Sequence, residues 1–288
     1  ERWGDTYTKP RGGMYVRENK RRMRRSRVLD KLRQGKVATC MKINLADARV
    51  IEIAAIAGFD CLWTDMEHVP NDLSTIEKQI LAGKAHDVDV VVRVPRGSYS
   101  DLIKPLEMDA TGIMVPHVMS LADAQQIIKH TKFHPIGLRP LDGGNADGAF
   151  CNIELTDYMQ QANNERFNIL QIEDPEPLAE LEEIISLPGL DMIFFGPGDF
   201  SQAIGAPGQG DHPEIEETRK KIATLARGNG KFAGTVGGVG DVEALTEMGY
   251  QFISVGADVI GLSQYFTNIV DQLSRQETVR VRSIYDDR

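Results

Sequence analysis

The chain has 288 residues, of which 41% are hydrophobic and 26% charged, and its formal net charge is −9 at pH 7. This length fits a single α/β barrel of about 250 residues, and no apolar run approaches the roughly 20 residues that cross a membrane. The start lacks the basic-then-apolar pattern of a secretory signal, and three scattered cysteines favour a reducing compartment. We therefore expect one main domain, located in the cytoplasm and without a membrane segment.

The charge is unevenly distributed along the chain. Residues 1–36 contain 13 Lys and Arg against 4 Asp and Glu, which leaves 20 against 38 for the remainder. The basic run 20–27 has no interleaved aromatic side chains, and it leads into 28–32, whose pattern predicts an amphipathic helix. A basic arm over 1–27, solvated or docked on the acidic body and partly flexible, is preferred to a nucleic-acid-binding segment. We expect one barrel domain over 28–275 and a tail over 276–288.

Beyond Gly35, apolar strand candidates alternate with amphipathic helix candidates about eight times. The predicted strands are 37–43, 61–64, 88–94, 112–115, 167–172, 192–195, 232–235 and 252–255. The predicted helices are 46–57, 73–85, 99–108, 121–130, 177–185, 213–228, 242–248 and 259–273. Regular alternation implies a parallel sheet, and eight such units fit a closed TIM (β/α)₈ barrel better than an open doubly wound sheet.

Active sites of such barrels are built by the loops that follow the carboxyl ends of the strands. The polar residues found at these positions, in chain order, are Lys42 and Asn44; Asp65, Glu67 and His68; Arg93 and Arg96; His117; Gln171, Glu173 and Asp174; and Asp199. Acids, histidines and arginines are therefore expected to converge on one face of the barrel.

Two carboxylates follow adjacent strands. Glu173 and Asp199 should point across the same mouth, which suits a hard divalent cation that keeps positions open for substrate oxygens and water. The alternative is two independent helix-start acids, with Asp199 capping a short helix at Phe200. Glycines flank Asp199 at 196 and 198, where backbone could approach a ligand closely. The later glycine run 237–240 could bind a phosphate, but an ordinary flexible loop is the preferred interpretation.

Three further side chains suggest acid–base and anion-binding roles. Asp65 and His68 are close enough in sequence to hydrogen-bond, which would fix the imidazole tautomer; the alternative is a solvated turn. Arg93 ends an apolar strand, where its planar fork suits a carboxylate or enolate oxygen, although an ion pair with a nearby acid would also account for it. A Schiff-base mechanism is set aside, because Lys42 is the only candidate lysine and the metal pair supplies an electron sink.

Several segments resemble one enzyme family, the class II metal-dependent pyruvate aldolases. The segments are 58–71, 91–93, 114–116, 171–173, 196–201 and 255–258, in order and with similar spacing over about 28–271. The family includes 4-hydroxy-2-oxoheptanedioate aldolase and 2-dehydro-3-deoxyglucarate aldolase, with macrophomate synthase and citrate lyase β-type enzymes as relatives. The resemblance implies a barrel of the phosphoenolpyruvate/pyruvate type and a homo-oligomer, a hexamer built as a trimer of dimers with a swapped last helix.

The resemblance also implies roles for individual residues. Glu173 and Asp199 would ligate Mg, Mn or Co, and Arg93 would hold the pyruvate enolate together with the metal. Gln171 would hydrogen-bond near the substrate, the backbone of Gly198 and Asp199 would receive the pyruvate carboxylate, and His68, oriented by Asp65, would be the base.

The chain departs from the family pattern at several positions. Lys42 stands where many relatives have a bulky aromatic, Met66 replaces a glycine, and Pro140 follows Arg139 where glycine is usual; the loop 141–148 is also atypical. These departures bear on the aldehyde that the enzyme would accept.

The leading hypothesis is reversible retro-aldol cleavage of a 4-hydroxy-2-oxo acid to pyruvate and an aldehyde, through a metal-bound enolate. Oxaloacetate decarboxylation or a macrophomate synthase-like reaction through the same enolate is the alternative, and a non-catalytic binding or scaffold barrel is a second. No nucleic-acid partner is expected.

Overall fold

The computed structural model of the chain describes residues 21–276. Eight parallel strands pair in sequence order and close on themselves, with β1 beside β8. The strands are β1 (Ala38–Ile43), β2 (Cys61–Asp65), β3 (Asp89–Arg93), β4 (Gly112–Val115), β5 (Phe167–Ile172), β6 (Met192–Phe195), β7 (Phe232–Gly237) and β8 (Phe252–Ala257). The predicted (β/α)₈ barrel is confirmed, and the described strand bounds lie within two residues of those predicted.

Side chains on each strand alternate between two cores, because successive residues of a strand point to opposite faces. On β3, Val91 belongs to the cluster inside the barrel, whereas Val90 and Val92 pack outward against the helices. On β6, Phe194 is inside and Phe195 outside. Both faces of the sheet are thus covered, which explains the uninterrupted apolar runs in the sequence.

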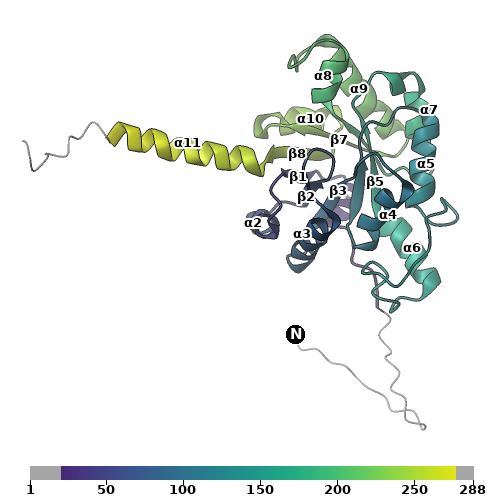
Figure 1. Cartoon of the computed structure of the whole chain (residues 1–288). Coiled ribbons are helices and arrows are strands. Elements are labelled where there is room, and N and C mark those ends of the chain that lie inside the picture. Colours follow the sequence, from purple (N-terminus) through teal and green to yellow (C-terminus); the bar gives the residue numbers. More distant parts are fainter. Residues whose placement is uncertain (1–20, 277–288) are drawn as a thin grey trace, which may run out of the picture.

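Helices surround the barrel (Figure 1). Those in the β-α units are α2 (Ala48–Ala57), α3 (Leu73–Ala85), α4 (Tyr99–Glu107), α5 (Leu121–Thr131), α7 (Leu181–Ser186), α9 (Pro213–Gly228), α10 (Val242–Met248) and α11 (Asp258–Gln276). Two α-helices that the sequence analysis did not predict are α6 (Leu155–Glu165) and α8 (Pro197–Ala203). Two 3₁₀ turns are η1 (Glu176–Glu180), which precedes α7 within the predicted helix 177–185, and η2 (Val239–Asp241).

A first helix, α1 (Arg27–Arg33), closes the amino-terminal end of the barrel. Its apolar side chains Val28, Leu29 and Leu32 are buried in the same cluster as the inward residues of the strands. The Ser26 side chain caps α1 by accepting a hydrogen bond from the Leu29 N–H. The helix predicted over 28–32 is therefore present, and most of the predicted arm (1–20), like the tail from 277, lies outside the described residues.

A buried carboxylate ties the start of the described chain to the barrel. Asp89 accepts hydrogen bonds from the Ser26 hydroxyl (2.7 Å) and the Val28 N–H (2.9 Å), and an Arg24 guanidinium nitrogen lies 3.0 Å from it. Arg24 also donates to the Thr111 hydroxyl. At least this basic residue of the arm is thus docked on acidic groups of the body.

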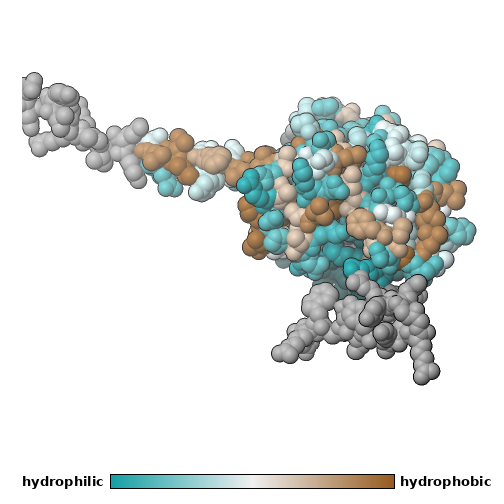
Figure 2. All heavy atoms as spheres, turned by 60° about the horizontal axis from the view of Figure 1, so that its bottom comes forward, coloured by the Kyte–Doolittle hydropathy of each residue, from teal (hydrophilic) through white to brown (hydrophobic). Residues whose placement is uncertain are grey.

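The last helix, α11, extends away from the barrel (Figure 1). Figure 2 shows hydrophobic side chains along it, and those that are exposed are Val259, Ile260, Leu262, Tyr265, Phe266, Ile269, Val270 and Leu273. No helix in the described part of the chain is long and apolar enough to span a bilayer.

Candidate active site

Four of the predicted polar residues lie on the inward face at the carboxyl ends of the first, second, third and fifth strands, whereas Arg96 pairs with Asp123 of α5. Lys42, Asp65, Arg93 and Gln171 each lie two residues beyond an inward apolar or cysteine side chain of the same strand. The period of two along a strand therefore carries them into the mouth of the barrel. Glu173 follows Gln171 with the same parity, one residue beyond the end of β5.

Asp65 and Arg93 form a buried ion pair. They are register partners on β2 and β3, and the Arg93 Nε donates to Asp65 Oδ1 at 2.9 Å while a second guanidinium nitrogen contacts Oδ2. The Lys42 ammonium lies 3.1 Å from the same carboxylate. Burial alone would raise the pKa of Asp65, but the hydrogen bonds and charge of Arg93, together with Lys42, lower that pKa to about 2. Asp65 is therefore a fixed anion.

This pairing corrects the expectation that Asp65 orients His68. Asp65 also accepts from the Glu67 N–H, and the acid beside His68 is Glu67, with Nε2 and Oε2 3.7 Å apart. The His68 side chain is 55% exposed at the mouth. The reason is register: Arg93 faces Asp65 directly across the strand pair, whereas His68 lies three residues beyond the end of β2.

Arg93 is held by acids on two sides, the alternative that its sequence position left open. Its Nη1 lies 2.8 Å from Glu67 Oε2, and its guanidinium stacks over the Trp63 ring at 4.8 Å from the centroid. A guanidinium has five N–H donors, of which two are hydrogen-bonded to Asp65, whereas the contact with Glu67 is an ion pair without a hydrogen bond. The other N–H donors are able to meet an anionic oxygen of a ligand.

Glu173 is a second buried acid of the mouth, at 1% exposure. Its carboxylate accepts hydrogen bonds from the His117 N–H (2.9 Å) and the Gln171 amide. Burial raises the pKa of Glu173 to about 7; the hydrogen bond and charge of His117 oppose this shift, and the charges of Glu67 and Asp199 add to it. Within residues 21–276, no lysine or arginine side chain pairs with Glu173.

Asp199 lies near Glu173 but is placed differently. It is exposed on the first turn of α8, and its side chain does not cap that helix, whose N-cap is Gly196. Gly196 is required by packing, because a Cβ there would lie 2.7 Å from a Glu173 oxygen. A Cβ at Gly198 would meet no atom within 4 Å, so space remains above this turn. The helix-cap reading of Asp199 is thus wrong.

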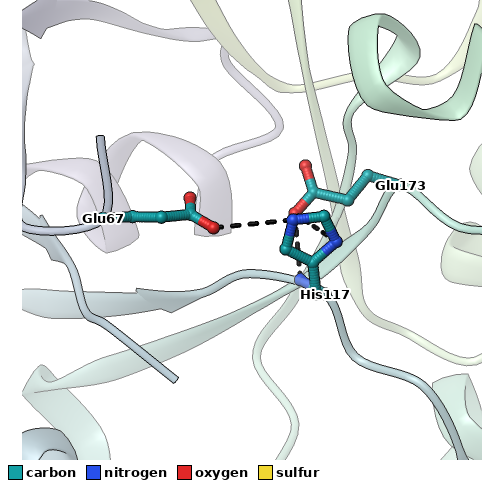
Figure 3. Close-up of side chains that lie close together, drawn as sticks. All are labelled: Glu67, His117 and Glu173. Atoms are coloured by element: carbon teal, nitrogen blue, oxygen red, sulfur yellow. Dashed lines mark hydrogen bonds and ion pairs between the residues drawn. The ribbon is translucent and has the colours of Figure 1, made fainter. Parts of the chain in front are cut away.

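The donor set at the mouth fits a divalent cation. Single ligand atoms of Glu67, His117 and Glu173 all lie within 4.8 Å of one another, as Figure 3 shows. The Gln171 Oε1 is buried without a hydrogen-bond partner, and the raised pKa of Glu173 signals negative charge that lacks compensation. A cation between these groups would compensate both. The sequence analysis placed Glu67 and His117 at strand ends but gave them no metal role.

Comparisons with known proteins connect the chain with one group of enzymes in both sequence and fold. The family model described as HpcH/HpaI aldolase/citrate lyase matches residues 39–264. A hydroxypyruvate/pyruvate aldolase from Pseudomonas aeruginosa is 31% identical over 234 residues, which are 81% of this chain and 87% of that protein. Among solved structures, an HpcH/HpaI aldolase from Desulfitobacterium hafniense has a TM-score of 0.80 at 27% identity, covering 85% of this chain and 95% of its own. Macrophomate synthase has a TM-score of 0.77 at 26% identity, covering 89% and 90%.

Proposed function

Because the chain belongs to the HpcH/HpaI aldolase/citrate lyase family, an enzyme family of carbon–carbon lyases, we propose that it cleaves a 4-hydroxy-2-oxo acid reversibly to pyruvate and an aldehyde with the help of a divalent cation. The resemblance inferred from the sequence motifs is thereby confirmed at the level of the family. The choice of aldehyde, the identity of the metal ion and the oligomeric state all belong to the proposal.

The buried Glu173 carboxylate carries the proposal. An acid without a lysine or arginine partner among the described residues, beside Glu67 and within the field of Asp199, is costly to keep ionised unless a cation joins it. Such a cost is typical of functional sites. Glu173 and Asp199 would hold the cation from the ends of two adjacent strands, and Gln171 would keep the Glu173 carboxylate oriented.

A bound divalent cation would act as a Lewis acid on the 2-oxo group of the substrate. Arg93 would donate N–H groups that do not bond Asp65 to oxygens on which negative charge develops, and its position is fixed by Asp65 and Glu67. The open space above Gly198 would admit the carboxylate of pyruvate to the backbone N–H groups of Gly198 and Asp199.

His68 would remove the proton from the substrate hydroxyl. It is exposed at the mouth, so it is able to reach a bound substrate directly. Its neighbour is Glu67 rather than Asp65, with Nε2 and Oε2 3.7 Å apart. Asp65 would act on the reaction through Arg93.

The similarity to macrophomate synthase favours a second candidate, a decarboxylation or addition that uses the same enolate. Loss of CO₂ from oxaloacetate requires the electron sink but no removal of a hydroxyl proton. The two candidates therefore share Glu173, Asp199 and Arg93 and differ in their need for His68.

The decisive experiment is a pyruvate-release assay on a panel of 4-hydroxy-2-oxo acids and on oxaloacetate. Protein treated with EDTA should be inactive, and Mg²⁺, Mn²⁺ or Co²⁺ should restore turnover to different extents, which identifies the preferred metal. Full activity after metal removal, with metal content checked by mass spectrometry, would refute the metal-dependent mechanism.

We further propose that the protein assembles as a homo-oligomer, a hexamer built as a trimer of dimers, in which α11 packs on another copy. The proposal is supported by the row of exposed apolar side chains on α11 and by two exposed isoleucines of α2, Ile53 and Ile56. Apolar surface of this extent is costly in water.

A further inference from the structure

His117 adopts an unusual backbone conformation at the end of β4. Its φ is +47°, in the left-handed region, which non-glycine residues seldom adopt. Such strain persists only where surrounding interactions maintain it, and it concentrates at functional sites. Here the conformation directs the His117 N–H to Glu173 Oε1 and places the ring between Glu67 and Glu173 (Figure 3).

The two ring nitrogens of His117 have different neighbours. Nδ1 lies 2.8 Å from Asp174 Oδ2, at hydrogen-bond distance, and 3.8 Å from Glu173 Oε1, whereas Nε2 lies toward Glu67, 3.5 Å from its Oε1. A carboxylate that accepts from one ring nitrogen fixes the neutral tautomer in which the other nitrogen carries a lone pair. Asp174 thus prepares Nε2 to donate electrons into the acidic cluster.

From this geometry we infer that His117 is a protein ligand of the cation at Glu173, through Nε2, with Asp174 as the positioning residue behind it. The inference rests on the proposed function only for the presence of a cation at Glu173. It adds a nitrogen ligand to a centre that was expected to have oxygen ligands alone, and it brings Glu67 within reach as a further oxygen ligand.

A nitrogen ligand changes which metal the centre prefers. Mg²⁺ favours oxygen ligands and keeps several waters, whereas imidazole suits transition metals, whose affinities generally rise from Mn²⁺ through Co²⁺ to Cu²⁺ and fall at Zn²⁺. We therefore expect Mn²⁺ and Co²⁺ to bind more tightly than Mg²⁺. The difference in affinity between these two metals and Mg²⁺ should become smaller when the imidazole is removed.

The variant His117→Gly tests the ligand with little disturbance of the backbone. Glycine accepts positive φ, and the N–H that donates to Glu173 is retained. A matched control is His130→Ala, since His130 is at the far end of α5 and stacks on Tyr99. Asp174→Asn tests the positioning residue.

Two measurements on the full-length protein decide the question, with Mn²⁺ as the probe. Titration calorimetry should show Mn²⁺ binding weakened about 10- to 100-fold in Asp174→Asn, at least as strongly in His117→Gly, and unchanged in His130→Ala. Pulsed electron paramagnetic resonance of bound Mn²⁺ should show coupling to a ligand ¹⁴N nucleus in the wild type and His130→Ala, and none in His117→Gly.

Other results would overturn the inference in distinguishable ways. If the nitrogen coupling persisted in His117→Gly and vanished in His68→Ala, His68 would be the ligand. If the wild type bound Mn²⁺ through Glu173 without any nitrogen coupling, His117 would be only a hydrogen-bonding neighbour, and the proposed function would stand. If Glu173→Gln did not alter Mn²⁺ binding, the proposed function itself would fail.

Discussion

At the scale of single residues, the mouth of the barrel contains two kinds of buried charge. Asp65 is neutralised within the protein by Arg93 and Lys42, and its pKa is low. Glu173 is surrounded by acids and hydrogen-bond donors without lysine or arginine, and its pKa is high. The first arrangement holds Arg93 in place, and the second attracts a cation. This difference leads to opposite expectations for the two acids.

The substitution Glu173→Gln should abolish turnover and weaken Mn²⁺ binding, while stability without metal stays equal or rises. The amide removes a buried charge that lacks compensation, but it is a poor metal ligand. Asp199→Asn should also abolish turnover. Pyruvate release, calorimetry and thermal melting in EDTA provide the measurements, and Glu176→Gln, on the exposed turn that follows, is the matched control. Turnover near the wild-type rate in Glu173→Gln would contradict the assignment.

His68→Ala should separate the two candidate reactions. Proton removal by a positioned base contributes roughly 10²- to 10⁴-fold, so retro-aldol cleavage should fall by that factor while oxaloacetate decarboxylation falls much less. Rates on both substrates, compared in one metal buffer, provide the measurement. A parallel fall in both would mean that His68 maintains the site rather than acting as the base.

Asp65→Asn should instead depress both reactions together. In this structure the Asp65 carboxylate holds Arg93, which both reactions need, and does not contact His68. A loss restricted to retro-aldol cleavage, measured with the same two substrates, would restore the pairing of Asp65 with His68 that the sequence suggested.

At the scale of elements, α1 and the segment before it close the amino-terminal end of the barrel. The apolar face of α1 completes the inner core, and Asp89 gathers Arg24, Ser26 and the Val28 N–H at the start of the helix. Removal of the arm up to residue 27 would therefore delete two of these contacts. A truncation intended to spare the barrel should end before Arg24.

Asp89→Asn should lower the free energy of unfolding by on the order of 3 kcal/mol, because it leaves Arg24 without its fully buried partner. Asp87 is the other acid beside Arg24, and the Asp87 side chain is 80% exposed. Asp87→Asn should therefore change the free energy of unfolding by less than about 1 kcal/mol. Urea denaturation of the two variants gives the comparison. Equal effects would show that burial does not distinguish the two pairs.

At the scale of the whole molecule, the projecting α11 carries exposed apolar side chains that the described part of the chain does not cover. The helix contacts the barrel through β1 and β8, and further along it exposes a row of large apolar side chains between Leu262 and Leu273. A second copy of the chain is the partner that we propose for this surface.

Phe266→Glu should therefore lower the molecular mass in solution, because a buried charge without a partner opposes packing of α11 on a neighbour. Light scattering after size-exclusion chromatography measures the mass. Gln264→Glu introduces the same charge on the same helix at a polar position and should leave the assembly intact. A monomeric wild-type protein would contradict the proposal.

The sequence by itself predicted the barrel and most of the polar side chains that lie at its mouth. Apolar strands alternating with amphipathic helices predicted the order of elements, and the period of two along each strand carried Asp65, Arg93, Gln171 and Glu173 inward. Two helices escaped prediction: α6 is mostly polar and buries only Tyr158 and Ala162, and α8 is only seven residues long.

The tertiary structure alone decided which of these side chains meet. Asp65 faces Arg93 because β2 and β3 pair in one particular register, and that register depends on how the whole barrel closes. His117 reaches the acids through a left-handed backbone that no residue type signalled. Contacts between strands depend on distances through space, and a one-dimensional pattern of residues fixes the face of each side chain but not its partner.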